Sequence, residues 1–150
     1  MKYALLFVGL IFFSCEKTPT DIPIGSENNV ETMVMFSANM SQVGNDDFNP
    51  DVDLLFVVGD FNDWCQTSCD QLIRINDDQY EITFTNSTNS FFQVDTEFQY
   101  KFRINEENWE TPNPLVSNCT PNEFTGYNRL HVIVAGQNSL QWYFNDENGN

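Results

Sequence analysis

Positive charge is scarce in this sequence, which has 6 Lys and Arg residues against 22 Asp and Glu residues and a formal net charge of −16 at pH 7. A surface with this balance repels nucleic-acid backbones and anionic lipid headgroups, so we exclude a nucleic-acid partner. The sequence lacks an Asp-x-Asp-x-Asp-Gly calcium loop, and its single His leaves a zinc site short of ligands. No metal or cofactor is expected.

Catalytic motifs are also missing. The sequence contains no Gly-x-Ser-x-Gly, no His-Glu-x-x-His and no phosphate-binding loop. The one histidine, His131, lies in a strand-like run between Leu130 and Val132, and nothing marks two of the many carboxylates as a glycosidase pair. We therefore expect a protein that is not an enzyme and whose molecular task is binding.

The N-terminal apolar run is too short to span a bilayer as a helix. It covers Tyr3–Phe13, follows the basic Lys2 and ends before Ser14 and Cys15, which is the arrangement of a secretory signal. The segment Phe12-Phe13-Ser14-Cys15 resembles the lipobox of bacterial lipoproteins. This resemblance implies lipidation of Cys15 and anchoring at a bacterial outer membrane or cell surface. The alternative is an ordinary cleaved signal with an incidental cysteine.

The chain has the length of one domain, and its composition divides it into four parts. Residues 1–14 are the predicted signal peptide. Residues 15–29 are polar and rich in Pro, Gly, Ser and Asn, which is typical of a flexible tether. The predicted folded domain covers residues 30–146, and residues 147–150 form a polar tail.

Short strand-like segments recur through this domain, and no window of eleven or more residues has a helical pattern. Alternating or apolar runs bounded by turn residues predict strands at 31–40, 52–59, 71–75, 79–85, 96–104, 130–134 and 140–144. This number of short strands predicts an all-β fold, an immunoglobulin-like antiparallel β-sandwich.

Three cysteines remain after Cys15. An exported chain can form disulfides, and Cys65 and Cys69 are close enough in sequence to close their own loop. We predict a disulfide between them. Three is an odd number, so Cys119 is left outside this pair.

Four segments occur in an order that points to a particular family. The first is Val57-Val58-Gly59-Asp60-Phe61-Asn62-Asp63-Trp64, followed by Phe98–Ile104, then Asn108–Pro114 with Trp109, and finally Gly126–Leu130 with Asn128. Together they resemble the glycogen- and starch-binding modules of the AMP-activated kinase β subunit, branching enzymes and isoamylases. The resemblance extends from about Val34 to Phe144.

This resemblance implies non-catalytic binding of a polysaccharide such as an α-glucan. By it, Trp64 and Trp109 stack on sugar rings, while Lys101 and Asn128 hydrogen bond to hydroxyl groups. Each residue has a structural alternative: core packing for the tryptophans, solubility for Lys101 and turn formation for Asn128. The alternative for the whole chain is a structural or protein-interaction lipoprotein with an envelope partner, using the same sandwich without binding sugar.

Overall fold

The computed structural model describes residues 31–44, 46–65, 69–115, 118–123 and 126–145. The predicted signal peptide (1–14), Cys15, the tether (15–29) and the tail (147–150) lie outside the described residues. In the described part of the chain, no helix is long and apolar enough to cross a membrane.

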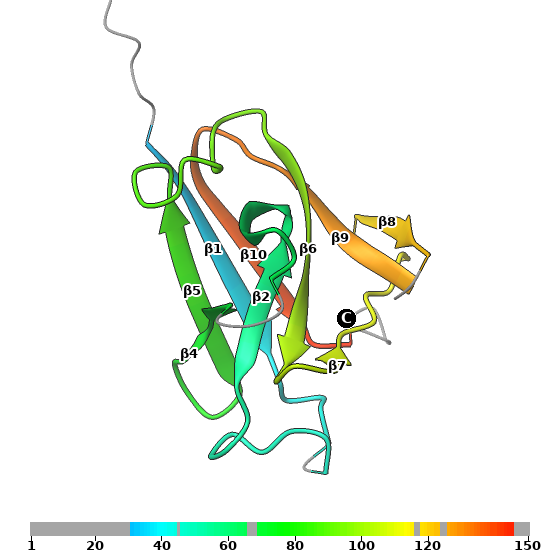
Figure 1. Cartoon of the computed structure of the whole chain (residues 1–150). Helices are drawn as coiled ribbons and strands as arrows, with labels where there is room; N and C mark the ends of the chain where they lie inside the picture. The colour runs from blue at the N-terminus through cyan, green and yellow to red at the C-terminus, as the bar shows by residue number, and fades with distance from the viewer. Residues whose placement is uncertain (1–30, 45, 66–68, 116–117, 124–125, 146–150) are drawn as a thin grey trace, which may run out of the picture.

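Two β-sheets pack against each other to form one domain (Figure 1). The four-stranded sheet has the order β10-β1-β5-β4, built from β10 (Gly136–Tyr143), β1 (Thr32–Asn39), β5 (Gln79–Thr85) and β4 (Ile73–Arg74). The six-stranded sheet has the order β3-β2-β6-β9-β8, built from β3 (Asp70–Gln71), β2 (Leu55–Gly59), β6 (Glu97–Ile104), β9 (Gly126–Val132) and β8 (Cys119–Asn122), with β7 (Asn108–Trp109) paired to β6. The predicted all-β sandwich is confirmed.

One strand pair departs from the antiparallel pattern. Strands β1 and β10 run parallel, with Phe36 opposite Leu140, whereas β1 and β5 run antiparallel, with Phe36 opposite Ile82. Since β1 is bonded on both sides, its inward side chains lie at the centre of the four-stranded sheet. The first and last strands of the sandwich are therefore neighbours.

Aromatic rings fill the space between the sheets. Phe36 is fully buried, and its ring centroid lies 5.1–6.2 Å from those of Phe61, Phe84, Phe92, Phe98 and Tyr100. The alternating Phe98, Tyr100, Phe102 and Ile104 of β6 all point into this core, as the period of a strand requires. Burial of these large side chains is the main force that holds the sheets together.

The predicted strand at 71–75 is divided between the two sheets. Its first part, β3, pairs with β2, and its second part, β4, pairs with β5. Leu72 lies between them, is buried in the core, and donates its backbone N–H to the carbonyl of Leu55 at 2.8 Å. The chain therefore crosses from one sheet to the other at this leucine.

A buried ion pair lies between the sheets. The Arg129 guanidinium and the Glu110 carboxylate are 2.8 Å apart, and both side chains are withdrawn from solvent. Glu110 also accepts the backbone N–H of Phe102 at 2.8 Å, and the Arg129 guanidinium lies 4.7 Å from the centre of the Trp142 ring. These contacts satisfy charges that would otherwise be very costly to bury.

Candidate functional site

The site begins where β2 ends, at Gly59. This residue pairs with Tyr100 of β6, and a Cβ atom placed on it would lie 2.3 Å from the backbone oxygen of Gln99 and 2.9 Å from Tyr100 Cβ. Only glycine fits this close approach of two strands. The first residue of the Gly-Asp-Phe-Asn-Asp-Trp segment is therefore explained by packing.

Asp60 fixes the turn that follows. One oxygen of its carboxylate accepts the backbone N–H of Gln99 at 2.8 Å, and the other accepts the indole N–H of Trp64 at 2.8 Å. A single side chain thus ties the turn to β6 and orients the tryptophan. Its neighbour Phe61 points the other way, into the core.

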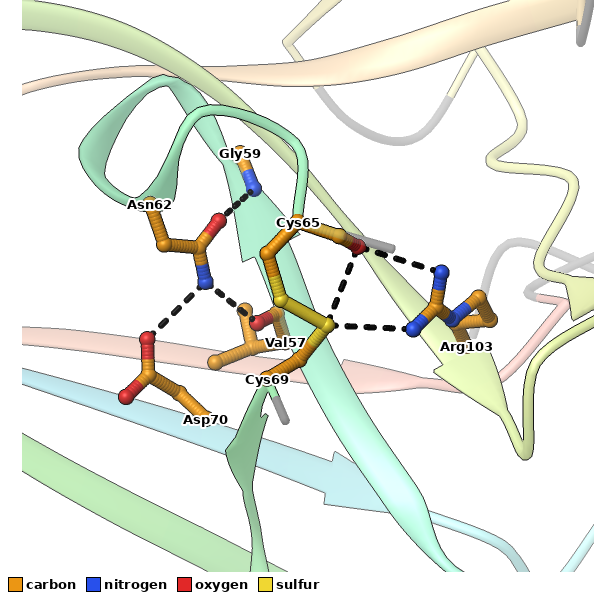
Figure 2. Close-up of a disulfide and its surroundings, with 7 residues drawn as sticks. All are labelled: Val57, Gly59, Asn62, Cys65, Cys69, Asp70 and Arg103. Carbon is orange, nitrogen blue, oxygen red and sulfur yellow. Dashed lines mark hydrogen bonds between the residues drawn. A yellow bond between two sulfur atoms is a disulfide. The ribbon is translucent and has the colours of Figure 1, made fainter. Parts of the chain in front are cut away.

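Asn62 holds the same turn from its other end. Its side-chain oxygen accepts the N–H of Gly59 at 2.9 Å, while its amide nitrogen donates to the Val57 carbonyl at 3.1 Å and to the Asp70 carboxylate at 2.9 Å (Figure 2). These bonds tie the turn to β2 and to Asp70, the first residue of β3. The asparagine of the segment is therefore a structural residue.

The backbone is strained at the point where Trp64 emerges. Asp63 and Trp64 have φ angles of 53° and 51°, in the left-handed region that non-glycine residues rarely adopt. The N–H of Trp64 donates to the carbonyl of Gly59 at 2.9 Å, which closes the turn. Strain of this kind is commonly kept at functional positions, where it holds a side chain in a required place.

The outer face of the six-stranded sheet receives this tryptophan. Cross-strand pairing places Lys101 beside Val58, and Arg103 beside both Phe56 and Trp109. Residues directly opposite one another in an antiparallel pair share a face of the sheet, so these side chains lie on the face away from the core. We call this surface the outer face.

Two indole rings meet on the outer face. The ring centroids of Trp64 and Trp109 are 6.5 Å apart, and their planes are inclined by 42°. Both residues are half-buried. The structure thus brings together the two tryptophans that the sequence singled out, from segments 45 residues apart in the chain, and we call them the tryptophan pair.

Arg103 lies directly against Trp109, one member of this pair, and was not predicted from the sequence. Its guanidinium carbon is 5.0 Å from the centre of the Trp109 ring and 5.7 Å from that of Phe56. Only 1% of the residue is exposed, and this burial lowers the pKa of Arg103 from its usual value. The alternation of β6 could have identified it, because Arg103 is two residues beyond Lys101 and must share its face.

A disulfide joins Cys65 and Cys69 immediately after Trp64. Arg103 contacts both cysteines: one terminal nitrogen donates to the Cys65 carbonyl at 3.2 Å, and the other donates to Cys69 Sγ at 3.1 Å (Figure 2). The disulfide loop and the tryptophan pair are therefore linked through one guanidinium group.

Direct hydrogen bonds from Lys101 and Asn128 to a sugar would require both side chains to be exposed, and the structure corrects this expectation. Lys101 is 0% exposed and Asn128 is 3% exposed, so neither stands at the surface. Loss of hydration lowers the pKa of Lys101. The Asn128 amide donates to the Gln99 side chain at 3.0 Å, and its oxygen has no hydrogen-bond donor among the described residues. Both residues lie buried, where a surface ligand does not reach them directly.

An open depression of about 760 Å³ lies beside Trp109 at one end of the sandwich. Polar side chains line much of it: Gln42, Asp47, Glu107, Asn108, Thr111 and Asn145.

No cluster of three or more His, Cys, Asp or Glu residues suited to a metal ion occurs in the described ranges. His131 packs edge-on against Phe98 and hydrogen bonds through Nε2 to Asn138 at 3.0 Å.

No protein-family model matches the chain, and no curated protein matches it. Among solved structures, the chain is similar to part of "Glycoside Hydrolase Family 15 Glucoamylase from Hypocrea jecorina", with a TM-score of 0.46 and 14% identity over 76% of this chain and 17% of that chain.

Proposed function

We propose that the chain binds a polysaccharide of the α-glucan class through the tryptophan pair, without turnover, as an exported domain that a lipid on Cys15 holds at a bacterial membrane surface. The observation that carries the proposal is the tryptophan pair itself, two indoles 6.5 Å apart on the outer face. Its place beside a strained turn supports a role beyond packing.

The chemistry of the pair suits sugar rings. A pyranose has an apolar face of C–H groups, and indole offers it a flat and rigid surface. Covering roughly 50–80 Å² of apolar surface per sugar contributes about 1–2 kcal/mol. Two such contacts with a few hydrogen bonds correspond to dissociation constants of roughly tens of micromolar to millimolar. This is the affinity range that we expect.

The inclination of the rings favours one glycan geometry. Planes inclined by 42° make a bent surface, not a flat one. Successive sugar rings of an α-1,4-linked glucan turn relative to one another along a coiled chain, whereas those of a β-1,4-linked glucan form a flat ribbon. A bent surface therefore favours the α-linked polymer.

Native gels cast with glycogen, amylopectin or a β-glucan test the proposal. We expect glycogen and amylopectin to retard the protein, and Trp64→Ala and Trp109→Ala each to abolish most of the retardation. Ile73→Ala is the matched control, because it removes an exposed apolar side chain from β4 in the other sheet. The proposal is contradicted if both tryptophan variants are retarded as strongly as the natural chain. It is also contradicted if none of the proteins is retarded in any gel.

The lipid anchor has a separate test. Cells expressing the full chain are grown with an alkyne-labelled fatty acid, and the labelled protein is detected after coupling to a fluorophore. We expect label on the natural chain and none on the Cys15→Ser variant. Equal labelling of both chains removes Cys15 as the attachment site while leaving sugar binding to be judged by the gels.

One observation favours the alternative of a protein-binding domain. Ile73 and Ile75 are 68% and 57% exposed at the edge of the four-stranded sheet, and Val52 is also exposed. Exposed apolar side chains at a sheet edge are a frequent means of protein association. Crosslinking of the membrane-held chain in cells, compared with an Ile73→Asp variant, tests this function independently of any glucan.

A further inference from the structure

The guanidinium group of Arg103 is enclosed between the disulfide loop and Trp109. Its two terminal nitrogens donate to the Cys65 carbonyl and to Cys69 Sγ, at 3.2 Å and 3.1 Å (Figure 2). Its central carbon lies over the Trp109 ring, 5.0 Å from the ring centre. The arginine therefore contacts the support of one indole and the face of the other.

Because Arg103 is buried, it depends on these contacts to stay in its position. The residue is 1% exposed, and a guanidinium carries five N–H donors that cannot be deprotonated in a protein. A buried charge of this kind needs acceptors, and the disulfide loop supplies two of them. If they are displaced, the guanidinium gains by moving toward water, and it then leaves the Trp109 ring.

The disulfide loop also adjoins the other indole. Trp64 directly precedes Cys65, and the backbone of Trp64 is already in a strained conformation. The disulfide fixes Cys65 and Cys69 as one unit, with Cα atoms 5.7 Å apart. A continuous series of contacts thus runs from Trp64 through the loop and Arg103 to Trp109.

We infer that Arg103 is the positioning residue of the tryptophan pair and that the Cys65–Cys69 disulfide controls it, so that polysaccharide binding requires the oxidised disulfide. The second part of this inference rests on the proposed function. The first part concerns only how the two indoles are held, and it can be measured without any sugar.

Reduction is a simple two-electron step. A dithiol reductant such as dithiothreitol gives two electrons and two protons to the disulfide, so the S–S bond breaks and two thiols form. The reductant becomes a cyclic disulfide. In the reduced chain the two sulfurs are no longer bonded, so the Cys65 carbonyl and Cys69 Sγ no longer present a fixed pair of acceptors to Arg103.

The experiment measures the indole pair and the sugar separately. Two indoles at 6.5 Å couple their electronic transitions and give a paired positive and negative band in circular dichroism, which we call the couplet. We record the couplet and glycogen affinity for the oxidised protein, the reduced protein, Arg103→Lys and Cys65→Ser/Cys69→Ser. Arg74→Lys is the control, because it makes the same substitution at a surface ion pair away from the outer face.

We expect the couplet to collapse on reduction and in Arg103→Lys, since lysine keeps the charge but lacks the planar fork. Glycogen affinity falls about fivefold to tenfold, as loss of a cation–π contact and its ordering effect would cause. Arg74→Lys keeps both signals. The couplet measurements are made where the far-ultraviolet spectrum shows the β-fold intact.

Each outcome is decisive. An unchanged couplet after reduction and in Arg103→Lys overturns the positioning role, whatever the glycogen result. A lost couplet with unchanged glycogen affinity overturns the redox control of binding. If the oxidised protein binds no glucan, the proposed function fails, while the couplet still decides the role of Arg103. If the double serine variant does not fold, reduction and Arg103→Lys provide the same test.

Discussion

Replacement of Gly59 by alanine tests how the turn before Trp64 is built. The added Cβ lies 2.3 Å from the Gln99 oxygen, so β2 and β6 must separate by about 0.7 Å to reach even the 3.0 Å below which such contacts are essentially never seen. The obstacle is backbone, which cannot rotate away as a side chain does. We therefore expect the upper end of the overpacking range, a loss of about 3 kcal/mol in the free energy of unfolding.

Gly136→Ala is the matched control. Gly136 has a φ of +86°, and a Cβ there meets nothing within 4 Å, so its only cost is backbone strain of about 1 kcal/mol. Thermal unfolding followed by circular dichroism compares the two variants. Since 1 kcal/mol shifts the midpoint of a domain of this size by about 4 °C, we expect Gly59→Ala to unfold roughly 12 °C lower and Gly136→Ala roughly 4 °C lower. Equal losses in the two variants would refute the steric explanation.

Two further predictions concern the buried polar groups between the sheets. Glu110→Gln leaves the Arg129 guanidinium buried without its carboxylate, so we expect the free energy of unfolding in urea to fall by about 3–5 kcal/mol. The double variant Glu110→Gln/Arg129→Met should recover most of this loss. A double variant as unstable as the single one would contradict this explanation. Burial raises the pKa of Tyr100 above its ordinary value of 10.0, so the unfolded chain releases this proton first and stability falls as pH rises above 10.0. Tyr100→Phe should lose less stability between pH 8 and 11 than the natural chain, and parallel losses would exclude Tyr100 as a cause.

Much of the fold could be predicted from the sequence, because buried strands leave a clear pattern. The alternation of Phe98, Tyr100, Phe102 and Ile104 gave β6 almost to the residue. The apolar run at β2 is continuous because side chains on both faces of this strand are buried. Val57 lies in the core, and Val58 is buried on the outer face. The short strands β7 and β8 have too few residues to show a period, and neither was predicted.

The pairing of strands with one another is harder to predict from the sequence than the strands themselves. Nothing in the composition of β1 or β10 indicates that they run parallel, because register depends on which edges meet in space. The crossing at Leu72 was hidden for a similar reason: a buried leucine between two short strands has the pattern of one longer strand.

The site was predicted in part. The family resemblance singled out Trp64 and Trp109, and the structure puts their rings side by side. Lys101 alternates with the core residues of β6, which predicts the face on which it lies but not its burial, since burial depends on what distant segments cover. Arg103 went unnoticed because its contact with Cys65 and Cys69 joins segments 34 to 38 residues apart.

The parallel pairing of β1 with β10 has a mechanical consequence. If the chain is held through residues before β1, a pulling force enters a strand that is hydrogen bonded along both edges. Such a force acts parallel to β1, so many backbone hydrogen bonds must break together and not one after another. A domain attached in this way therefore resists extension by a force applied at its N-terminal end.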